Sequence, residues 1–392
     1  MKKILFVTYD FPYPTTSGGK NRAYNLIKFA GNGHDIHLFS FTRDDFKKEY
    51  VDQIKKIGVL SVTTHKRRKV KDIRNIIGVF SPTQSIFKKL YFDKSILSLL
   101  IDLVVEKKVD VIHFESFYTG FYISSEFKKL DVKQIFGTEN IEHQVYKDYV
   151  SNRVSRILKP LYEREVGKIK KEEEEMFEAS DICLAVTEAE KKIINDTSTK
   201  KCAIIENGID INSFTYKKPE KNEAVRLLFV GNFSYFPNVD AINFFYSDVF
   251  KNLSGQFRLT IIGKKAHGLL AKNDSRINCI EFVSDIKDAY KNCDIMVSPV
   301  RIGGGTNFKI LEAMAAGVPI IAHPARLQSL GVVSGKHVVT AKTADEFIST
   351  ILKLSLDYKK RVALSAAARV FVEEKYSWEN IGKKLNSIWE NL

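Results

Sequence analysis

The sequence is poor in cysteine and has no apolar run long enough to cross a bilayer. Its four cysteines lie in or beside apolar stretches and lack metal-site spacing: Cys183, Cys202, Cys279 and Cys293. We therefore expect buried thiols in a reducing cytoplasm, with neither disulfides nor a metal centre. The best membrane candidate, 96–105, is short and contains Asp102, so no transmembrane helix is expected. The apolar run 4–7 leads directly into polar residues, which indicates a first strand and not a signal peptide.

Acidic residues are too few to balance the basic ones, and the net charge is +14. A nucleic acid, an anionic membrane or an anionic substrate would each suit this charge. We expect no nucleic-acid partner, because no RNA- or DNA-binding module is recognisable. The basic cluster 65–71 precedes apolar residues at helical spacing over 73–80. This pattern suggests peripheral contact with anionic lipid at the inner face of the cell membrane. A solvated loop before a core-facing helix is the alternative, and it fits slightly better.

Short apolar runs alternate with helical patterns along the whole chain, which predicts an α/β fold with doubly wound parallel sheets. The predicted strands are 3–8, 35–41, 59–62, 109–114, 132–136 and 181–186, then 226–230, 259–263, 278–282, 295–297 and 338–340. The polar stretch 217–223 is typical of a linker. We therefore expect one domain over 1–215, completed by 377–392, and a second over 224–376. The charged run 170–175 is expected to form a solvated helical face.

A glycine-rich loop stands between a predicted strand and a predicted helix at 301–312, Arg-Ile-Gly-Gly-Gly-Thr-Asn-Phe-Lys-Ile-Leu-Glu. Glycines allow backbone N–H groups to approach a ligand, and the start of a helix, here 307–316 capped by Thr306, attracts an anion. Lys309 and Glu312 share one helical face. They would offer an ammonium group to a diphosphate and a carboxylate to a ribose diol. An ordinary glycine turn with a surface ion pair explains this stretch equally well by itself.

The same stretch resembles the donor-site signature of the retaining glycosyltransferases of family 4, in particular a bacterial subgroup with Gly-Gly-Gly-Thr-x-x-Lys-x-x-Glu-Ala. The segments 207–210 and 231–238 resemble further family motifs in the same order. The resemblance implies a GT-B fold, with two Rossmann-like domains facing a cleft and a C-terminal helix that crosses back to the first domain. It implies an acceptor domain followed by a donor domain. The implied reaction moves a sugar from a nucleoside diphosphate sugar to a glycan or lipid-linked acceptor in surface polysaccharide synthesis, without a metal or another cofactor.

The resemblance also implies the site residues. The implied donor contacts are Gly231, Asn232, Gly304, Gly305, Thr306, Lys309 and Glu312, with Lys309 also serving catalysis. Gly18 and Gly19 follow the first strand, in a loop that approaches the donor or the acceptor in the family. Glu139 is the first candidate to support the reacting carbon, in a position where many relatives carry histidine, and His143 is the second. Gly304 stands where better-known members carry a glutamate.

Three alternatives stay open on the sequence. Glu139 and His143 could simply cap the helix that follows them. The protein could be a sugar-nucleotide epimerase or phosphorylase with the same fold. It could also be a non-catalytic subunit that binds a sugar nucleotide.

Overall fold

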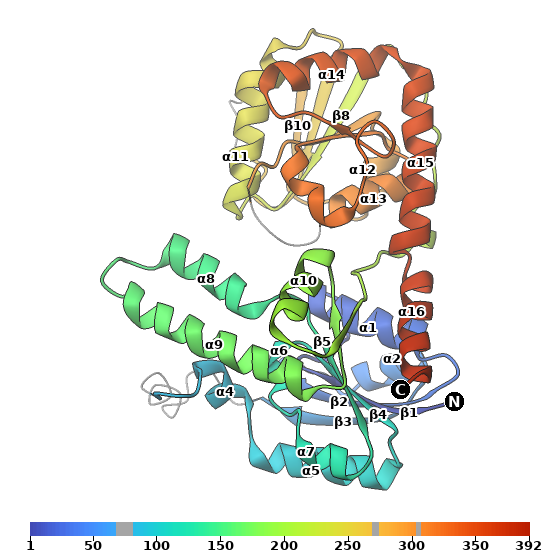
Figure 1. Ribbon diagram of the computed structural model, residues 1–392. Coiled ribbons are helices and arrows are strands. Elements are labelled where there is room, and N and C mark those ends of the chain that lie inside the picture. Colours follow the sequence, from blue (N-terminus) through green and yellow to red (C-terminus); the bar gives the residue numbers. More distant parts are fainter. Residues whose placement is uncertain (68–80, 269–273, 303–306) are drawn as a thin grey trace. The chain divides into compact units, whose positions relative to one another are not determined.

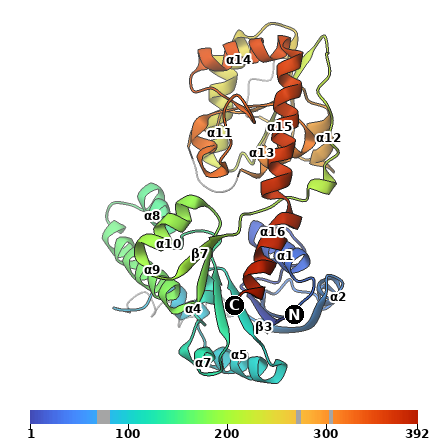
Figure 2. The same cartoon turned by 45° about the vertical axis from the view of Figure 1, so that its right-hand side comes forward.

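The computed structural model describes residues 1–67, 81–268, 274–302 and 307–392. The chain divides into two compact units (Figures 1 and 2). The first unit contains residues 1–207 and 381–392, and the second contains 208–380. The chain thus leaves the first unit after Asn207, whereas the sequence prediction ended the first domain at 215. The predicted membrane segment 73–80 and most of its basic cluster lie outside the described residues.

The first unit is built on a seven-stranded sheet in which all neighbouring strands pair in parallel. In sheet order the strands are β3 (Val59–Lys66), β2 (Asp35–Thr42), β1 (Lys3–Thr8), β4 (Val111–Glu115), β5 (Lys133–Gly137), β6 (Ile182–Ala185) and β7 (Lys201–Ile204). The central strands are buried on both faces, which explains their nearly continuous apolar sequences. The order reverses between β1 and β4, the point where ligands gather on such sheets.

Helices cover both faces of this sheet (Figure 1). The helices of this unit are α1 (Gly18–Ala30), α2 (Tyr50–Lys55), α4 (Ile86–Tyr91), α5 (Lys94–Lys107), α6 (Phe117–Gly120), α7 (Ser125–Lys129), α8 (Glu142–Arg153), α9 (Lys159–Ala179) and α10 (Glu188–Thr197). Leu5 and Val7 of β1 share a core with Ile96 and Leu100 of α5. Phe6 points to the opposite face, where its ring lies 6.3 Å from that of Trp389. The alternation along β1 therefore fills two cores.

The second unit repeats this plan with a six-stranded parallel sheet. Its strands, in sheet order, are β10 (Ile277–Ile280), β9 (Phe257–Ile262), β8 (Val225–Val230), β11 (Ile295–Ser298), β12 (Ile320–Ala322) and β13 (Val339–Thr340). Its helices are α11 (Phe236–Phe244), α12 (Ile286–Lys291), α13 (Phe308–Ala316), α14 (Ala344–Leu356) and α15 (Tyr358–Tyr376). One core joins β8 to α11 and α14, and a second joins it to α13 and α15. The α/β prediction is confirmed in both units.

The last helix, α16 (Trp378–Glu390), ends in the first unit. Trp389 is fully buried there, and its indole N–H donates to His113 Nδ1 at 3.3 Å. Lys384 pairs with Glu206 Oε2 at 3.0 Å. Gly382 packs against the backbone of Phe29, where a Cβ would lie only 2.6 Å away. The chain thus completes its first unit with its final residues.

Candidate functional site

A cavity of about 660 Å³ opens at the carboxyl ends of the strands in the second unit, a volume in the range of small-ligand sites. Its lining comes from four strand ends and from the starts of α11, α12 and α13: Val230, Gly231, Asn232, Tyr235, Asn238, Ile262, Gly263, Lys264, Glu281, Phe282, Val283, Ile286, Val300, Ile302, Asn307, Phe308 and Lys309. The sheet order reverses between β8 and β11, so the cavity occupies the switch point of this sheet.

Two glycines form the floor of the cavity, where backbone approaches backbone. Gly263 has a φ of +143°, and a Cβ there would lie 1.8 Å from the Gly231 carbonyl oxygen. A Cβ on Gly231 would in turn lie 3.0 Å from Cγ of Asn238. The Asn238 amide donates to the Asn232 carbonyl at 2.9 Å. Gly231 and Asn232, which the resemblance makes donor contacts, thus line the cavity, and Asn238 braces the loop that carries them.

The Lys309 side chain reaches across this floor. Its Nζ donates to the Val230 carbonyl at 2.9 Å and to Asn238 Oδ1 at 3.2 Å. It also lies 5.1 Å from the ring centroid of buried Phe229, a cation–π distance. The ammonium group is therefore held at the end of β8, beside the amino end of α13. An anion placed there is attracted both by the ammonium group and by the start of the helix.

The helix α13 begins one residue later than predicted. Phe308 is its first residue and Asn307 its N-cap, so the Thr306 cap is wrong by one position. Gly317 ends the helix in the left-handed conformation, with φ +81°, which suits a residue without Cβ. The predicted donor residues Gly304, Gly305 and Thr306 lie outside the described residues.

Glu312 stands on the next turn of α13, beyond the cavity lining. Its Oε2 accepts a hydrogen bond from the Tyr290 hydroxyl at 2.8 Å. Burial raises the pKa of Glu312, while the Tyr290 hydroxyl and Lys309 oppose the rise. Tyr290 is fully buried in α12. Nothing in the sequence marked it, because its role depends on packing between two helices.

In the first unit, Glu139 follows β5 at the carboxyl edge of the sheet. Burial, reinforced by the nearby Glu115 carboxylate, raises the pKa of Glu139 to about 7. A Cβ on Gly19 would lie 2.6 Å from Glu139 Oε1, whereas Gly18 faces open space. The structure thus brings Gly19 and Glu139 together. Both glycines belong to the first turn of α1, capped by Ser17, and not to the expected loop.

His143 points away from this edge, toward α9. Its Nδ1 lies 2.6 Å from Glu173 Oε2, and Glu173 Oε1 accepts from the backbone N–H of Glu142 at 2.7 Å. Glu173 is fully buried, and neighbouring Glu172 accepts from the backbone of Ser85 at 2.8 Å. The prediction of a solvated face over 170–175 is therefore wrong for these two residues, which hold α8 and α4 in place.

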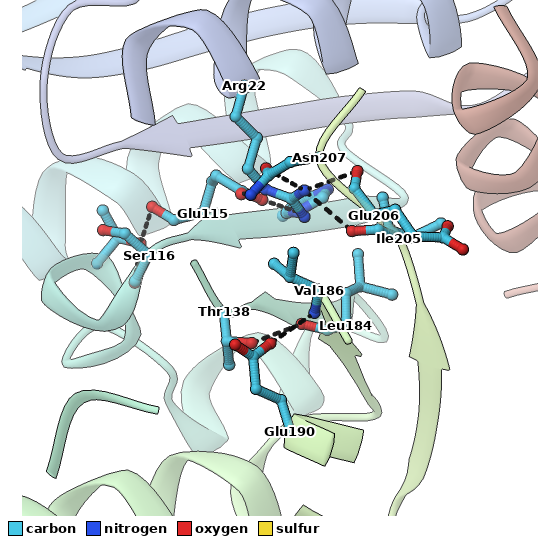
Figure 3. Close-up of polar contacts among 12 residues, drawn as sticks. Arg22, Glu115, Ser116, Thr138, Leu184, Val186, Glu190, Ile205, Glu206 and Asn207 are labelled. Atoms are coloured by element: carbon cyan, nitrogen blue, oxygen red, sulfur yellow. Dashed lines mark hydrogen bonds and ion pairs between the residues drawn. The ribbon is translucent and has the colours of Figure 1, made fainter. Parts of the chain in front are cut away.

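Figure 3 shows a buried charged network that the sequence did not reveal. Its members Glu115 and Arg22 both influence the pKa of Glu139. Arg22 Nε donates to Glu115 Oε1 at 2.6 Å. Its Nη1 donates to the carbonyls of Ile205 and Glu206 and to Asn207 Oδ1, at 2.9–3.1 Å. Burial alone would raise the pKa of Glu115, but Arg22 and then His113 hold it below the usual value. The network joins α1 and β4 to the segment that leaves the first unit.

The described residues contain neither a cluster of metal ligands nor a helix able to span a membrane. No three His, Cys, Asp or Glu side chains within them converge as metal ligands would. No helix in the same residues has both the length and the apolar character needed to traverse a bilayer.

Comparisons with known proteins place both halves of the chain in sugar-transferring families. The family described as Glycosyltransferase Family 4 matches residues 16–213, and that described as Glycosyl transferases group 1 matches 224–357. An uncharacterized 44.6 kDa protein in the cps region of Klebsiella pneumoniae is 23% identical, over 97% of this chain and 98% of its own. An uncharacterized glycosyltransferase of Methanocaldococcus jannaschii is 24% identical, over 77% of this chain and 73% of its own.

Solved structures share the architecture. Anabaena HepE in complex with UDP superimposes with a TM-score of 0.67 at 12% identity, over the full length of both chains. The apo form of the lipopolysaccharide outer core galactosyltransferase WaaB gives 0.64 at 14% identity, also over both full lengths. At these identities the likeness concerns the fold alone, and it confirms the expected two-domain GT-B architecture.

Proposed function

Because the chain belongs to glycosyltransferase family 4, we propose that it transfers a sugar from a nucleoside diphosphate sugar to a glycan or lipid-linked acceptor, with retention of configuration. The cps-region relative and the galactosyltransferase WaaB support a role in surface polysaccharide synthesis. The complex of HepE with UDP supports a nucleotide-sugar donor. The reaction would take place in the cytoplasm, where the acceptor would be met at the inner face of the membrane.

The cavity at the switch point of the second sheet is the observation that supports the donor site. Its glycine floor leaves room for a diphosphate against the backbone. Lys309 and the amino end of α13 supply positive charge at the same place. The departing diphosphate would be stabilised by these groups, together with the N–H groups of Gly304, Gly305 and Thr306, without a metal. We assign the ribose diol to Glu312, whose second carboxylate oxygen is not used by Tyr290.

In the retaining reaction proposed here, the acceptor hydroxyl attacks on the face from which the diphosphate leaves. A departing phosphate oxygen takes the hydroxyl proton, so the new glycosidic bond forms as the bond to phosphate breaks. We assign the support of the reacting carbon to Glu139, which burial keeps partly protonated at neutral pH. His143 is engaged by Glu173 and is the weaker candidate. Gly18 and Gly19 would keep the approach to Glu139 open.

The donor site is tested by Lys309→Ala and Glu312→Ala. We expect each to weaken nucleotide binding in calorimetry, and Lys309→Ala to slow transfer on the order of a hundredfold, typical for loss of one transition-state donor. Lys353→Ala on the exposed surface of α14 is the control. Transfer should persist in a chelator. Unchanged turnover in both variants would refute the site, and binding without transfer or hydrolysis would indicate a non-catalytic subunit.

A further inference from the structure

The helices α8 and α9 form a hairpin that projects from the sheet of the first unit (Figures 1 and 2). Its base is fixed by Glu173, which binds the backbone at the start of α8. Farther out, the rings of Tyr146 and Tyr162 stack across the two helices, 6.4 Å apart. Val150 is buried between these contacts and the tip. The hairpin is therefore anchored at its base, and its two helices pack against each other.

Exposed apolar side chains are concentrated in this hairpin, with Ile157 and Leu158 in the turn at its tip. Of the eighteen large apolar side chains that stand exposed in the described residues, five fall within 145–161. They are Val145, Tyr149, Ile157, Leu158 and Leu161. Ile157, in the turn between the helices, is 90% exposed. Scattered exposed apolar residues are ordinary, but a concentrated group marks a surface that meets an apolar partner.

The same segment carries positive charge. Residues 145–164 contain five basic and two acidic residues. Lys147, Arg156 and Arg164 are exposed, and Lys159 retains 44% of its side-chain exposure beside Glu163. Basic residues around an apolar tip complement anionic lipid, because the apolar side chains enter the head-group region while the cations meet phosphates. A protein interface is less well matched, since its core is depleted in lysine.

A hollow of about 120 Å³ lies nearer the base of the hairpin, between α4, α8 and α9. Ile86, Tyr146, Leu161 and Tyr162 line it together with the charged side chains Arg164, Glu165 and Lys168. Lys168 pairs with Glu165 there, so the hollow belongs to the support of the hairpin and not to its exposed tip.

We propose that the tip of the α8–α9 hairpin is a membrane-docking surface specific for anionic bilayers. Ile157 and Leu158 would sit at the level of the head groups, and Arg156 and Lys159 would bind lipid phosphates. This surface differs from the segment 73–80 suggested by the sequence. It is independent of sugar transfer, so its test needs no donor or acceptor.

The test measures flotation of the full-length chain with phosphatidylcholine vesicles, with and without phosphatidylglycerol. We expect binding only to the anionic vesicles. The double variant Ile157→Ser/Leu158→Ser should bind at least ~10-fold more weakly than the parent chain, because two apolar side chains no longer enter the lipid. Arg156→Glu/Lys159→Glu should also weaken binding. Any binding that this variant retains should depend less on salt than that of the parent chain does. Leu356→Ser, at a site 83% exposed in the second unit, is the matched control.

A second measurement reports insertion directly. Ile157→Trp should shift its fluorescence to shorter wavelength when anionic vesicles are added, whereas Leu356→Trp should not. Failure of the parent chain to bind anionic vesicles would overturn the proposal, as would a serine double variant that binds like the control. Sedimentation that shows a dimer lost in the same double variant, without vesicle binding, would assign the patch to a second copy of the chain and equally overturn it.

Discussion

At the scale of single residues, Glu139 carries the clearest pH dependence. Its pKa in the fold is about 7, raised by burial from an unfolded value near 4.5. The folded state therefore binds the proton more tightly than the unfolded state between these pH values. Stability from this group is fully present below the unfolded pKa and is lost as pH rises toward 7. Replacement by glutamine removes that loss.

We expect Glu139→Gln to gain stability relative to the parent by up to about 3 kcal/mol between pH 5 and pH 8. The measurement is urea unfolding at both pH values, monitored through a spectroscopic signal that reports on the first unit. Transfer should fall in the same variant if Glu139 supports the reacting carbon. Glu188→Gln, at an exposed position of α10, is the control. A stability difference independent of pH would show that the Glu139 carboxyl does not titrate as described.

The Arg22–Glu115 pair gives a second prediction at this scale. Both side chains are at most 2% exposed, so removing one partner leaves a buried charge without compensation. Arg22→Met should lower the free energy of unfolding by about 3–5 kcal/mol. Glu115→Gln in the same chain should restore part of this loss, because it removes the stranded charge. A double variant less stable than the single variant would contradict this account of Glu115.

At the scale of elements, two helical glycines respond oppositely to alanine. Gly167 in α9 has open space where a Cβ would stand, so Gly167→Ala should stabilise by about 0.5–1 kcal/mol. In α6, a Cβ on Gly120 would lie 2.6 Å from Met176 Sδ and 2.8 Å from the Phe136 ring. Gly120→Ala should therefore destabilise by about 1–3 kcal/mol. Thermal unfolding of both variants tests this prediction. Melting temperatures that shift in the same direction would contradict the packing described.

Sequence periodicity predicted most of these elements but missed two strands. β7 and β12 are four and three residues long. Length alone does not explain why they were missed, because β13, of two residues, was predicted. Glu172 and Glu173 were misjudged because their charge suggested solvent, whereas backbone N–H groups distant in sequence donate to them in the core. Local pattern predicts an element, but it does not reveal which distant backbone groups a side chain will meet.

The same limit applies to the candidate site. The loop, Lys309 and the helix α13 could be identified because glycine, charge and helix start follow one another in the chain. Tyr290 and Arg22 could not, because their partners lie on other elements: Glu312 for Tyr290, Glu115 and Asn207 for Arg22. Residues that bind a ligand through local geometry are predictable, whereas those that position them depend on the completed fold.

At the scale of the whole molecule, residues 381–392, which include most of α16, complete the first unit. A substitution in this part of the helix therefore tests the stability of the first unit separately from that of the second. Trp389 is fully buried in the first unit, against Phe6 and His113. Trp389→Ala should destabilise that unit by about 3–5 kcal/mol. The donor cavity is lined by residues of the second unit. Nucleotide binding should therefore survive the substitution, even though transfer is lost.

Phe347→Ala supplies the mirror-image variant, because Phe347 is fully buried in the core of the second unit. Calorimetry with and without UDP distinguishes the two cases. In Trp389→Ala, the transition of the first unit should move to lower temperature while UDP still raises that of the second. In Phe347→Ala, the transition that responds to UDP should itself move down. If UDP instead raised the temperature of the transition that Trp389→Ala lowers, the nucleotide would bind to the first unit. The assignment of the donor site to the second unit would then be wrong.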